Sequence, residues 1–222
     1  MARREAADPT PPEAPRPRFA ILGSGRGSNA EALMAAFASG FLPAELAVVI
    51  ADREAGILDR AAARDVPTEL CPSRDRPRAA HEAELLTCLQ RHRVEHLLLA
   101  GYLRILSADF LRQLSGSVLN IHPSLLPDFP GLGAAARQWR AGVRVAGATV
   151  HYVDAGVDTG PILLTGSLEV RGDEGEAGLA QRILTEVEHV IYKRAVWLLC
   201  ARLRHAQGSQ EEPWRTHFPE PT

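Results

Sequence analysis

The sequence predicts a single α/β domain: a doubly wound (Rossmann-like), mostly parallel sheet with an antiparallel edge and a long C-terminal helix. Two observations carry this prediction. Up to Ile121, short apolar runs alternate with helix-length amphipathic stretches, which is the pattern of strands joined by right-handed crossover helices. Beyond that point, two apolar runs are separated by a turn alone, as in an antiparallel pair.

The parallel strands are expected where apolar residues run together, and the helices where they recur every three or four positions. The predicted strands are Arg18–Gly23, Leu46–Ala51, Val66–Leu70, His96–Ala100 and Ser117–Ile121. The predicted helices are Asn29–Ser39, Ile57–Arg64, Arg78–His92 and Ser107–Leu114. The segment HLLLA is apolar almost throughout, which is typical of a strand buried on both faces. Ser107 is a suitable N-cap for the fourth helix.

The antiparallel edge is expected from Ala146–Val153 and Pro161–Leu168, which are joined by the turn DAGVDTG. After them, Gly178–Arg204 carries apolar residues at helical spacing and predicts one long closing helix. We expect the domain to span residues 18–205. Residues 1–17 are rich in proline, alanine and charge and predict a disordered leader, and residues 206–222 predict a polar C-terminal tail.

Composition narrows the function classes. The 222 residues carry 25 basic and 27 acidic side chains, a net charge of −2, which argues against a strongly basic nucleic-acid-binding protein. The 3 cysteines are odd in number and widely spaced, so neither a disulfide framework nor a CxxC metal site is expected, and a cytoplasmic location fits best. No apolar run approaches the roughly 20 residues of a membrane span, so no membrane association is expected.

A glycine-rich turn, GSGRGSN (Gly23–Asn29), lies between the first predicted strand and helix. Glycines bring backbone N–H groups close to a ligand, and the helix N-terminus favours a phosphate there. The segment is neither a Walker loop nor a complete dinucleotide-binding motif, because the required lysine and third glycine are missing. Asp52, at the end of the next strand, is a weak candidate for a ribose ligand. A tight turn without any ligand is the alternative.

Asn120 and His122 lie two residues apart at the end of a predicted parallel strand. Their side chains therefore share one face, at the sheet edge where doubly wound folds bind ligands. An amide beside an imidazole can stabilise an oxyanion and transfer a proton. A histidine that only stabilises the strand end is the alternative.

Asp158 lies in the glycine-punctuated turn between the last two strands. An aspartate in such a turn is usually a turn former. If the turn folds back over the strand ends, its carboxylate can hold His122 and raise the pKa of that imidazole. A metal site made by His122, His151 and Asp158 has no supporting ligand spacing, and we expect no metal.

Several ordered motifs carry a resemblance to a known family. They are SGRGSN (Ser24–Asn29), LAGYLRIL (Leu99–Leu106), NIHPSLLP (Asn120–Pro127), FPGL (Phe129–Leu132), GATVHYVDAGVDTGPI (Gly147–Ile162) and EHVIY (Glu188–Tyr192). Over about residues 18–200 the chain resembles the phosphoribosylglycinamide formyltransferases, folate-dependent enzymes of purine synthesis. Because the motifs occur together and in order, the resemblance is more specific than any one of them.

The resemblance implies a role for each matching residue. Asn120, His122 and Asp158 would be catalytic. The substrate glycinamide ribonucleotide would contact Gly27, Ser28, Asn29, Thr185 and Glu188. Folate would contact Arg78, Leu103, Arg104, Ile105, Leu106, Asn120, Asp154, Ala155, Gly156, Val157 and Asp158. The formyl donor would be 10-formyltetrahydrofolate, no metal would be required, and the chain would be a monomer or homodimer.

The chain also departs from the family pattern. Gly133 stands where a histidine usually follows FPGL, and Thr185 stands where a longer polar side chain is expected. The first departure affects the tuning of the rate more than the type of reaction. Methionyl-tRNA formyltransferases and formyltetrahydrofolate hydrolases resemble the same core, but they carry a further domain. An N-formyltransferase acting on another amine, such as a sugar nucleotide, and an inactive folate- or nucleotide-binding relative remain alternatives.

Overall fold

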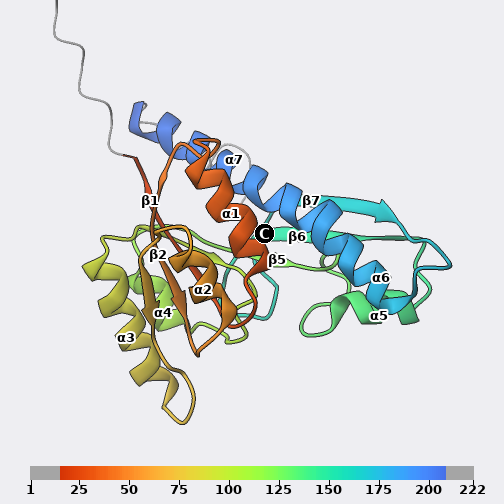
Figure 1. The fold of residues 1–222 in the computed structure, drawn as a ribbon, viewed down its shortest axis with the longest axis horizontal. Coiled ribbons are helices and arrows are strands. Elements are labelled where there is room, and N and C mark those ends of the chain that lie inside the picture. Colours follow the sequence, from red (N-terminus) through yellow and green to blue (C-terminus); the bar gives the residue numbers. More distant parts are fainter. Residues whose placement is uncertain (1–15, 209–222) are drawn as a thin grey trace, which may run out of the picture.

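The computed structural model describes residues 16–208, which form a seven-stranded sheet covered by helices on both faces (Figure 1). The strand order is β3-β2-β1-β4-β5-β6-β7. The strands are β1 (Arg18–Gly23), β2 (Glu45–Ala51), β3 (Thr68–Leu70), β4 (His96–Leu99), β5 (Val118–His122), β6 (Val145–Tyr152) and β7 (Ile162–Glu169). Neighbours from β3 to β5 pair in parallel, whereas β6 and β7 pair antiparallel. The predicted fold class is confirmed.

The first four helices and the C-terminal helix follow the predicted order, whereas the short helix Ala134–Arg140 was not predicted. The helices are α1 (Ser28–Ala38), α2 (Gly56–Ala62), α3 (Arg78–Arg91), α4 (Ala108–Gln113), α5 (Ala134–Arg140), α6 (Gly175–Arg182) and α7 (His189–Gly208), with the π-helical stretch η1 (Ile183–Glu188) between the last two. Ser107 caps α4 as predicted, because its side chain accepts a hydrogen bond from the Phe110 N–H. No helix of the described part is long and apolar enough to cross a membrane.

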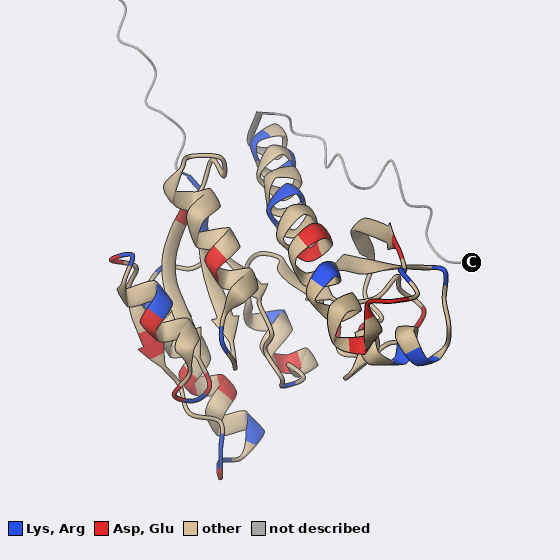
Figure 2. Ribbon diagram, turned by 45° about the vertical axis from the view of Figure 1, so that its right-hand side comes forward, with Lys and Arg blue, Asp and Glu red and all other residues tan. Residues whose placement is uncertain are grey.

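Two apolar cores, one on each face of the sheet, explain the continuous apolar strands. In β1, Phe19 and Ile21 belong to the core shared with α1 and α7, whereas Ala20 and Leu22 belong to the core shared with α3. Alternate side chains of a strand point to opposite faces, so a strand covered on both faces needs apolar residues at every position. Acidic and basic side chains are interspersed over the helices outside these cores (Figure 2).

The C-terminal helix differs in one respect from the prediction of a single continuous helix. It begins at Gly175, and the six residues Ile183–Glu188 form a π-helical stretch before the helix continues as α7. Hydrophobic spacing cannot reveal one wider turn, because the apolar side chains on both sides still face the core. π-Helical turns are rare and often lie at functional sites, and this one ends at Glu188.

The chain termini lie only partly within the described residues. The predicted leader, 1–17, overlaps them at Arg16 and Pro17, and Pro17 already belongs to the fold, since its carbonyl accepts the N–H of Glu45. Residues 1–15 lie outside the described part. The predicted tail begins at Ala206, but α7 continues to Gly208, and residues 209–222 lie outside the described part.

His96 is a buried histidine that is held in its neutral form. It is 6% exposed, and its Nδ1 accepts the N–H of Ser117 at 2.9 Å. A backbone N–H can only donate, so Nδ1 must keep its lone pair. Burial accordingly lowers the pKa of His96 from its ordinary value of 6.5. Between the lowered pKa of the folded chain and the ordinary pKa of the unfolded chain, the imidazole is protonated only when the chain is unfolded. Acid therefore lowers the free energy of unfolding in this range.

We therefore expect a smaller acid dependence of folding when His96 is replaced. His96→Gln keeps a group that can accept the Ser117 N–H but cannot titrate. Between about pH 7.5 and pH 5.5, the free energy of unfolding should fall less steeply with acid in this variant than in the parent chain. The reason is that unfolding of the variant takes up fewer protons, by up to about one. Urea unfolding at several pH values measures both slopes. Equal slopes would contradict the assignment.

Candidate active site

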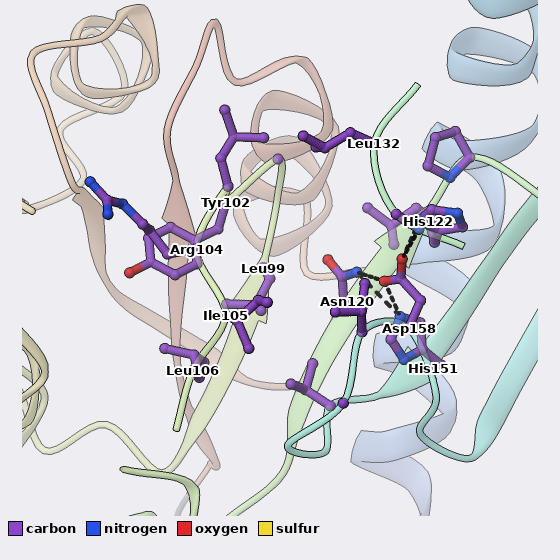
Figure 3. A pocket seen from close by; sticks show the side chains of 18 of the residues that line it. Leu99, Tyr102, Arg104, Ile105, Leu106, Asn120, His122, Leu132, His151 and Asp158 are labelled. Carbon is purple, nitrogen blue, oxygen red and sulfur yellow. Dashed lines mark hydrogen bonds and ion pairs between the residues drawn. The ribbon is translucent and has the colours of Figure 1, made fainter. Parts of the chain in front are cut away.

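The carboxyl ends of the central strands open onto a cavity of about 460 Å³, called here the active-site cavity. Its walls come from the end of β5, from the segments that follow β4 and β5, and from the loop between β6 and β7, together with Asn29 and Glu188. Figure 3 shows Asn120, His122, His151 and Asp158 close together, with Tyr102, Arg104 and Ile105 across the cavity. This is the sheet edge at which the sequence predicted a ligand site.

The structure brings Asn120, His122 and Asp158 into contact. The Asp158 carboxylate lies 3.1 Å from Nδ1 of His122, and it accepts the Asn120 amide at 3.4 Å. The loop between β6 and β7 thus folds back over β5, which is the arrangement that a catalytic role of Asp158 requires. The same carboxylate accepts the Gly131 N–H at 2.7 Å, so it joins three segments of the chain.

His122 is buried between two acceptors. Its Nε2 lies 2.9 Å from the Phe129 carbonyl, while Nδ1 faces Asp158. Burial lowers the pKa of His122, and the Phe129 carbonyl and the Asp158 carboxylate oppose that shift. The ring is therefore neutral over more of the pH range than an exposed histidine. Both nitrogens nevertheless have partners that stabilise the imidazolium once a proton arrives. Such a group is suited to gaining a proton during a reaction.

Asp158 remains ionised despite its burial. Burial raises the pKa of its carboxyl, but the nearby imidazole of His151, the hydrogen bond from the Gly131 N–H and the nearby His122 bring the net pKa below the ordinary value. Its backbone φ is +55°, a left-handed conformation that aspartate tolerates better than most residues. The tight turn and the carboxylate contacts therefore occur at one residue.

His151 is a member of this cluster that sequence reasoning considered only as an unsupported metal ligand. In the antiparallel pairing of β5 and β6 it stands opposite Asn120. Its Nδ1 lies 2.9 Å from the Tyr152 carbonyl, which fixes the hydrogen on that nitrogen, and Nε2 lies 3.2 Å from the Asn120 amide. His151 thus orients Asn120. The feature that identifies His151 is its position opposite Asn120 in the sheet. This position is known only once the pairing of β5 with β6 is known.

The glycine-rich turn meets the C-terminal helix. Gly27 has φ +80° and precedes α1, and an added Cβ would lie 2.8 Å from the Ile57 side chain, so glycine is required there. Ser28 pairs with His189 at 2.7 Å, and the Asn29 amide donates to Glu188 at 2.5 Å. Burial raises the pKa of Glu188.

Asn29 carries an unused acceptor at the cavity. Its Oδ1 is buried and has no hydrogen-bond partner among the described residues, although Asn29 lines the active-site cavity. A buried polar atom without a partner is costly unless a ligand or a water satisfies it. A donor on a bound substrate would fill this role.

Thr185 is not brought to the cavity. It is exposed, and its hydroxyl donates to the Gln181 carbonyl of the preceding turn at 2.9 Å. The π-helical stretch places Glu188 inward, whereas Thr185 faces away from the site. A contact between Thr185 and the substrate therefore finds no support in this geometry.

The segment predicted to contact folate, Leu103–Leu106, lines the active-site cavity. It is anchored from outside the cavity: the Leu103 N–H donates to Ser24 at 3.1 Å, and Arg104 lies 3.7 Å from Asp52. Asp52 is 1% exposed and also accepts the Ser73 hydroxyl at 2.8 Å. It does not line the cavity, so its carboxylate holds the loops, and the hypothesis of a ribose ligand is not supported.

The other predicted folate residues divide between two cavities. Asp154, Gly156, Val157 and Asp158 line the active-site cavity, but Ala155 does not. Arg78, the first residue of α3, lines a neighbouring cavity of about 230 Å³ that shares Tyr102–Ile105 with the first. Arg76 and Arg104 line it too, so this smaller cavity is rich in positive charge.

Comparisons with known proteins agree with this geometry. The sequence profile of the formyl transferase family matches residues 17–196. The phosphoribosylglycinamide formyltransferase of Bacillus subtilis (strain 168) is 39% identical over 181 residues, which cover 81% of this chain and 92% of that protein. The chain belongs to the phosphoribosylglycinamide formyltransferases.

Two further relatives place the chain within the family. It is similar to glycinamide ribonucleotide transformylase 1 from Symbiobacterium toebii, with 39% identity, a TM-score of 0.82, and coverage of 89% of this chain and 93% of that one. It is also 43% identical over 207 residues to a trifunctional purine biosynthetic protein of Drosophila pseudoobscura pseudoobscura, spanning 90% of this chain but 15% of that protein. The match to the trifunctional protein therefore concerns one part of it.

Gly133, where the resemblance led us to expect a histidine, has a backbone conformation of its own. It has φ +69° and precedes α5, and an added Cβ would meet nothing within 4 Å. The space is therefore open, but the backbone conformation favours glycine. Support for the loop comes from Arg137 on α5, whose guanidinium donates to the Phe129 carbonyl at 2.8 Å.

Replacing Asp158 should change the protonation of His122 in a defined direction. The carboxylate raises the pKa of that imidazole, so Asp158→Asn should lower it further below 6.5. Histidine ring resonances followed by NMR during a pH titration measure this shift. Asp154→Asn is the matched control, since Asp154 lies in the same loop and bonds Gly156 and Thr159 instead. An unchanged His122 titration in Asp158→Asn would contradict the contact.

Proposed function

We propose that this chain transfers the formyl group of 10-formyltetrahydrofolate to the primary amine of glycinamide ribonucleotide. One observation carries the proposal: Asp158, distant in sequence, meets Asn120 and His122 beside a cavity that also reaches Asn29 and Glu188. Membership of the family supports the reaction type. The identity of donor and acceptor rests on what the relatives are named for and on the chemistry of the cavity.

The two sides of the cavity suit the two substrates. On one side, the half-exposed apolar side chains of Leu103 and Ile105 and the loop Asp154–Asp158 would hold a flat heterocycle such as the pterin of folate. On the other, the turn Gly27–Asn29 at the start of α1 would bind the phosphate of the ribonucleotide through backbone N–H groups. Glu188 would accept a hydrogen bond from the ribonucleotide.

In the proposed reaction the substrate amine attacks the formyl carbon, and a new C–N bond forms. The electron pair of the C=O bond moves onto the formyl oxygen, where the Asn120 amide stabilises the negative charge and His122 adds to this once it has taken up the proton of the amine. The two contacts of the Asn120 amide, 3.2 and 3.4 Å long, are weak enough to be exchanged for this oxygen. The C=O bond then re-forms, the bond from carbon to the folate nitrogen breaks, and that nitrogen takes the proton that His122 received from the amine.

His122 and Asp158 would have different roles in the proton transfer. Because burial keeps His122 neutral more readily than expected from the carboxylate alone, the ring would take the proton lost by the attacking amine. The Asp158 carboxylate would stabilise the resulting imidazolium and hold its orientation. Asp158 would thus tune the pKa of His122 upward, as the sequence predicted, although burial keeps the net pKa below its ordinary value.

Loss of either residue should abolish most of the turnover while the fold is kept. His122→Ala and Asp158→Asn should each lower kcat by about 100-fold or more, the range found when a transition-state hydrogen bond is removed. A formyl-transfer assay measures this with purified protein, glycinamide ribonucleotide, and 10-formyltetrahydrofolate or its dideaza analogue, followed through the absorbance of the released folate. Circular dichroism checks the fold.

The same assay separates the alternatives. Folate release that requires glycinamide ribonucleotide supports the transferase. Release without any amine would indicate a hydrolase. Folate binding without release would indicate a different amine acceptor or an inactive relative. Full activity in both variants would contradict the proposed mechanism.

The substrate side offers a matched pair of variants. Asn29→Ala removes the unpartnered oxygen and also leaves the buried Glu188 without its amide partner, so kcat/KM for glycinamide ribonucleotide should fall roughly 10- to 100-fold. Thr185→Ala, on the helix surface outside the cavity, should leave the kinetic constants for both substrates unchanged. Steady-state kinetics at varied ribonucleotide concentration compares them. A larger effect from Thr185→Ala would reverse the assignment.

A further inference from the structure

A group of metal-ligand side chains lies away from the active-site cavity, between the edge strand β3 and the end of α3. Ligand atoms of Glu69, Cys88 and His92 all lie within 4.8 Å of one another, and no other group of three such residues this close occurs among residues 16–208. None of the three lines either of the cavities described above. The proposed reaction therefore makes no use of them.

The positions of these residues follow from helix and strand geometry. Cys88 and His92 are four residues apart at the end of α3, so their side chains share one face of the helix. Glu69 is in β3 and Cys71 follows two residues later, so their side chains share one face of the strand. The two faces meet, because the ligand atoms of Glu69, Cys88 and His92 lie within 4.8 Å of one another. Cys71, a buried free thiol on the same face of the strand as Glu69, is a fourth ligand-type side chain beside this group.

The group is enclosed but not sealed. Cys71 and Cys88 are 3% and 1% exposed, whereas the side chains of His92 and Glu69 are 20% and 25% exposed. The thiols therefore lie at the inner end and the imidazole and carboxylate at the outer end. A cation could enter from the Glu69 and His92 side without unfolding the helix.

Two thiols, one imidazole and one carboxylate are the donors that Zn²⁺ takes in proteins. With bonds of about 2.0–2.3 Å in a tetrahedron, neighbouring ligand atoms are roughly 3.3–3.8 Å apart. Nε2 of His92 and Oε1 of Glu69 are 2.8 Å apart, and the ligand atoms of Glu69, Cys88 and His92 all lie within 4.8 Å of one another. Side-chain rotation that moves these three atoms by about 1 Å would bring them to the separations of a zinc site, and the thiol of Cys71 would turn in as the fourth ligand.

A neighbouring arginine would balance the net charge of such a site. Two thiolates and one carboxylate around Zn²⁺ leave a net charge of −1, and the Arg91 guanidinium lies 3.1 Å from the Glu69 carboxylate. On binding, each thiol would release its proton to the solvent, and the His92–Glu69 hydrogen bond would give way to two bonds to the metal.

We propose that Glu69, Cys71, Cys88 and His92 form a structural site for Zn²⁺ that ties the edge strand β3 to the C-terminal end of α3. The edge strand has three residues and pairs with β2 alone. A tie to α3 would stabilise the part of the sheet with the fewest backbone partners.

Cobalt(II) tests the ligand set directly, because Co²⁺ takes tetrahedral zinc sites and its thiolate bonds absorb in the near ultraviolet. The full-length chain, kept reduced, should develop a thiolate-to-cobalt charge-transfer band that saturates at one equivalent and is abolished by added Zn²⁺. Cys88→Ser and His92→Gln should lose saturable binding at the same concentrations. Cys71→Ser should lose about half of the band, since one of two thiolates is gone. Cys200→Ser, a buried cysteine on α7, is the matched control and should keep the whole band.

Thermal unfolding supplies a second measurement. Zn²⁺ should raise the Tm of the parent chain and of Cys200→Ser, but not that of His92→Gln, a substitution at a partly exposed side chain. The proposal is overturned if the reduced parent chain shows no charge-transfer band. It is equally overturned if the band survives intact in both Cys88→Ser and His92→Gln.

Discussion

The site depends on one buried carboxylate. The side chain of Asp158 is 12% exposed, and a charge in that position is stable only when its oxygens are paired. The partners come from three segments: Asn120 and His122 on β5, Gly131 on the loop that follows β5, and His151 on β6. The carboxylate can be satisfied only if all three segments are in place at once. Burial of this charge therefore couples the folding of the β6–β7 loop to the assembly of the catalytic residues.

The change of strand direction at β5 makes this assembly possible. A purely parallel sheet would send the chain from β5 into a crossover helix and back to the opposite end of the sheet. Here β6 returns antiparallel beside β5, and its register sets His151 opposite Asn120. The loop after β6 is then near enough to place Asp158 on β5. On the other side of the cavity, the π-helical stretch ends at Glu188 and meets Asn29 on α1, so two local irregularities frame an otherwise regular sheet.

Properties that depend on local pattern could be predicted from the sequence, and those that depend on long-range contact could not. The strand boundaries of β1, the Ser107 cap and the shared face of Asn120 and His122 follow from apolar runs, side-chain chemistry and the two-residue period of a strand. The contact of Asp158 with His122 joins residues 36 positions apart, and only the loop conformation creates it. The π-helical turn and the outward position of Thr185 have no hydrophobic signature. Cys71 and Cys88 gave no metal motif either, because their closeness arises only when α3 packs on β3.

Arg137 gives a physical account of the missing histidine at position 133. A histidine there would adopt φ +69°, a conformation that costs a non-glycine residue free energy. Glycine removes that cost, and the side chain that holds the loop Phe129–Gly131 comes from another residue. Arg137, one turn into α5, donates to the carbonyls of Phe129, Pro130 and Gly131. The Phe129 carbonyl is also the partner of His122 Nε2, so the guanidinium competes for the oxygen that stabilises the imidazolium, and its charge lowers the pKa of His122. The loop is thus held by a permanent cation. Burial lowers the pKa of His122 most, and the charges of Asp158 and Arg137 then act on that pKa in opposite directions.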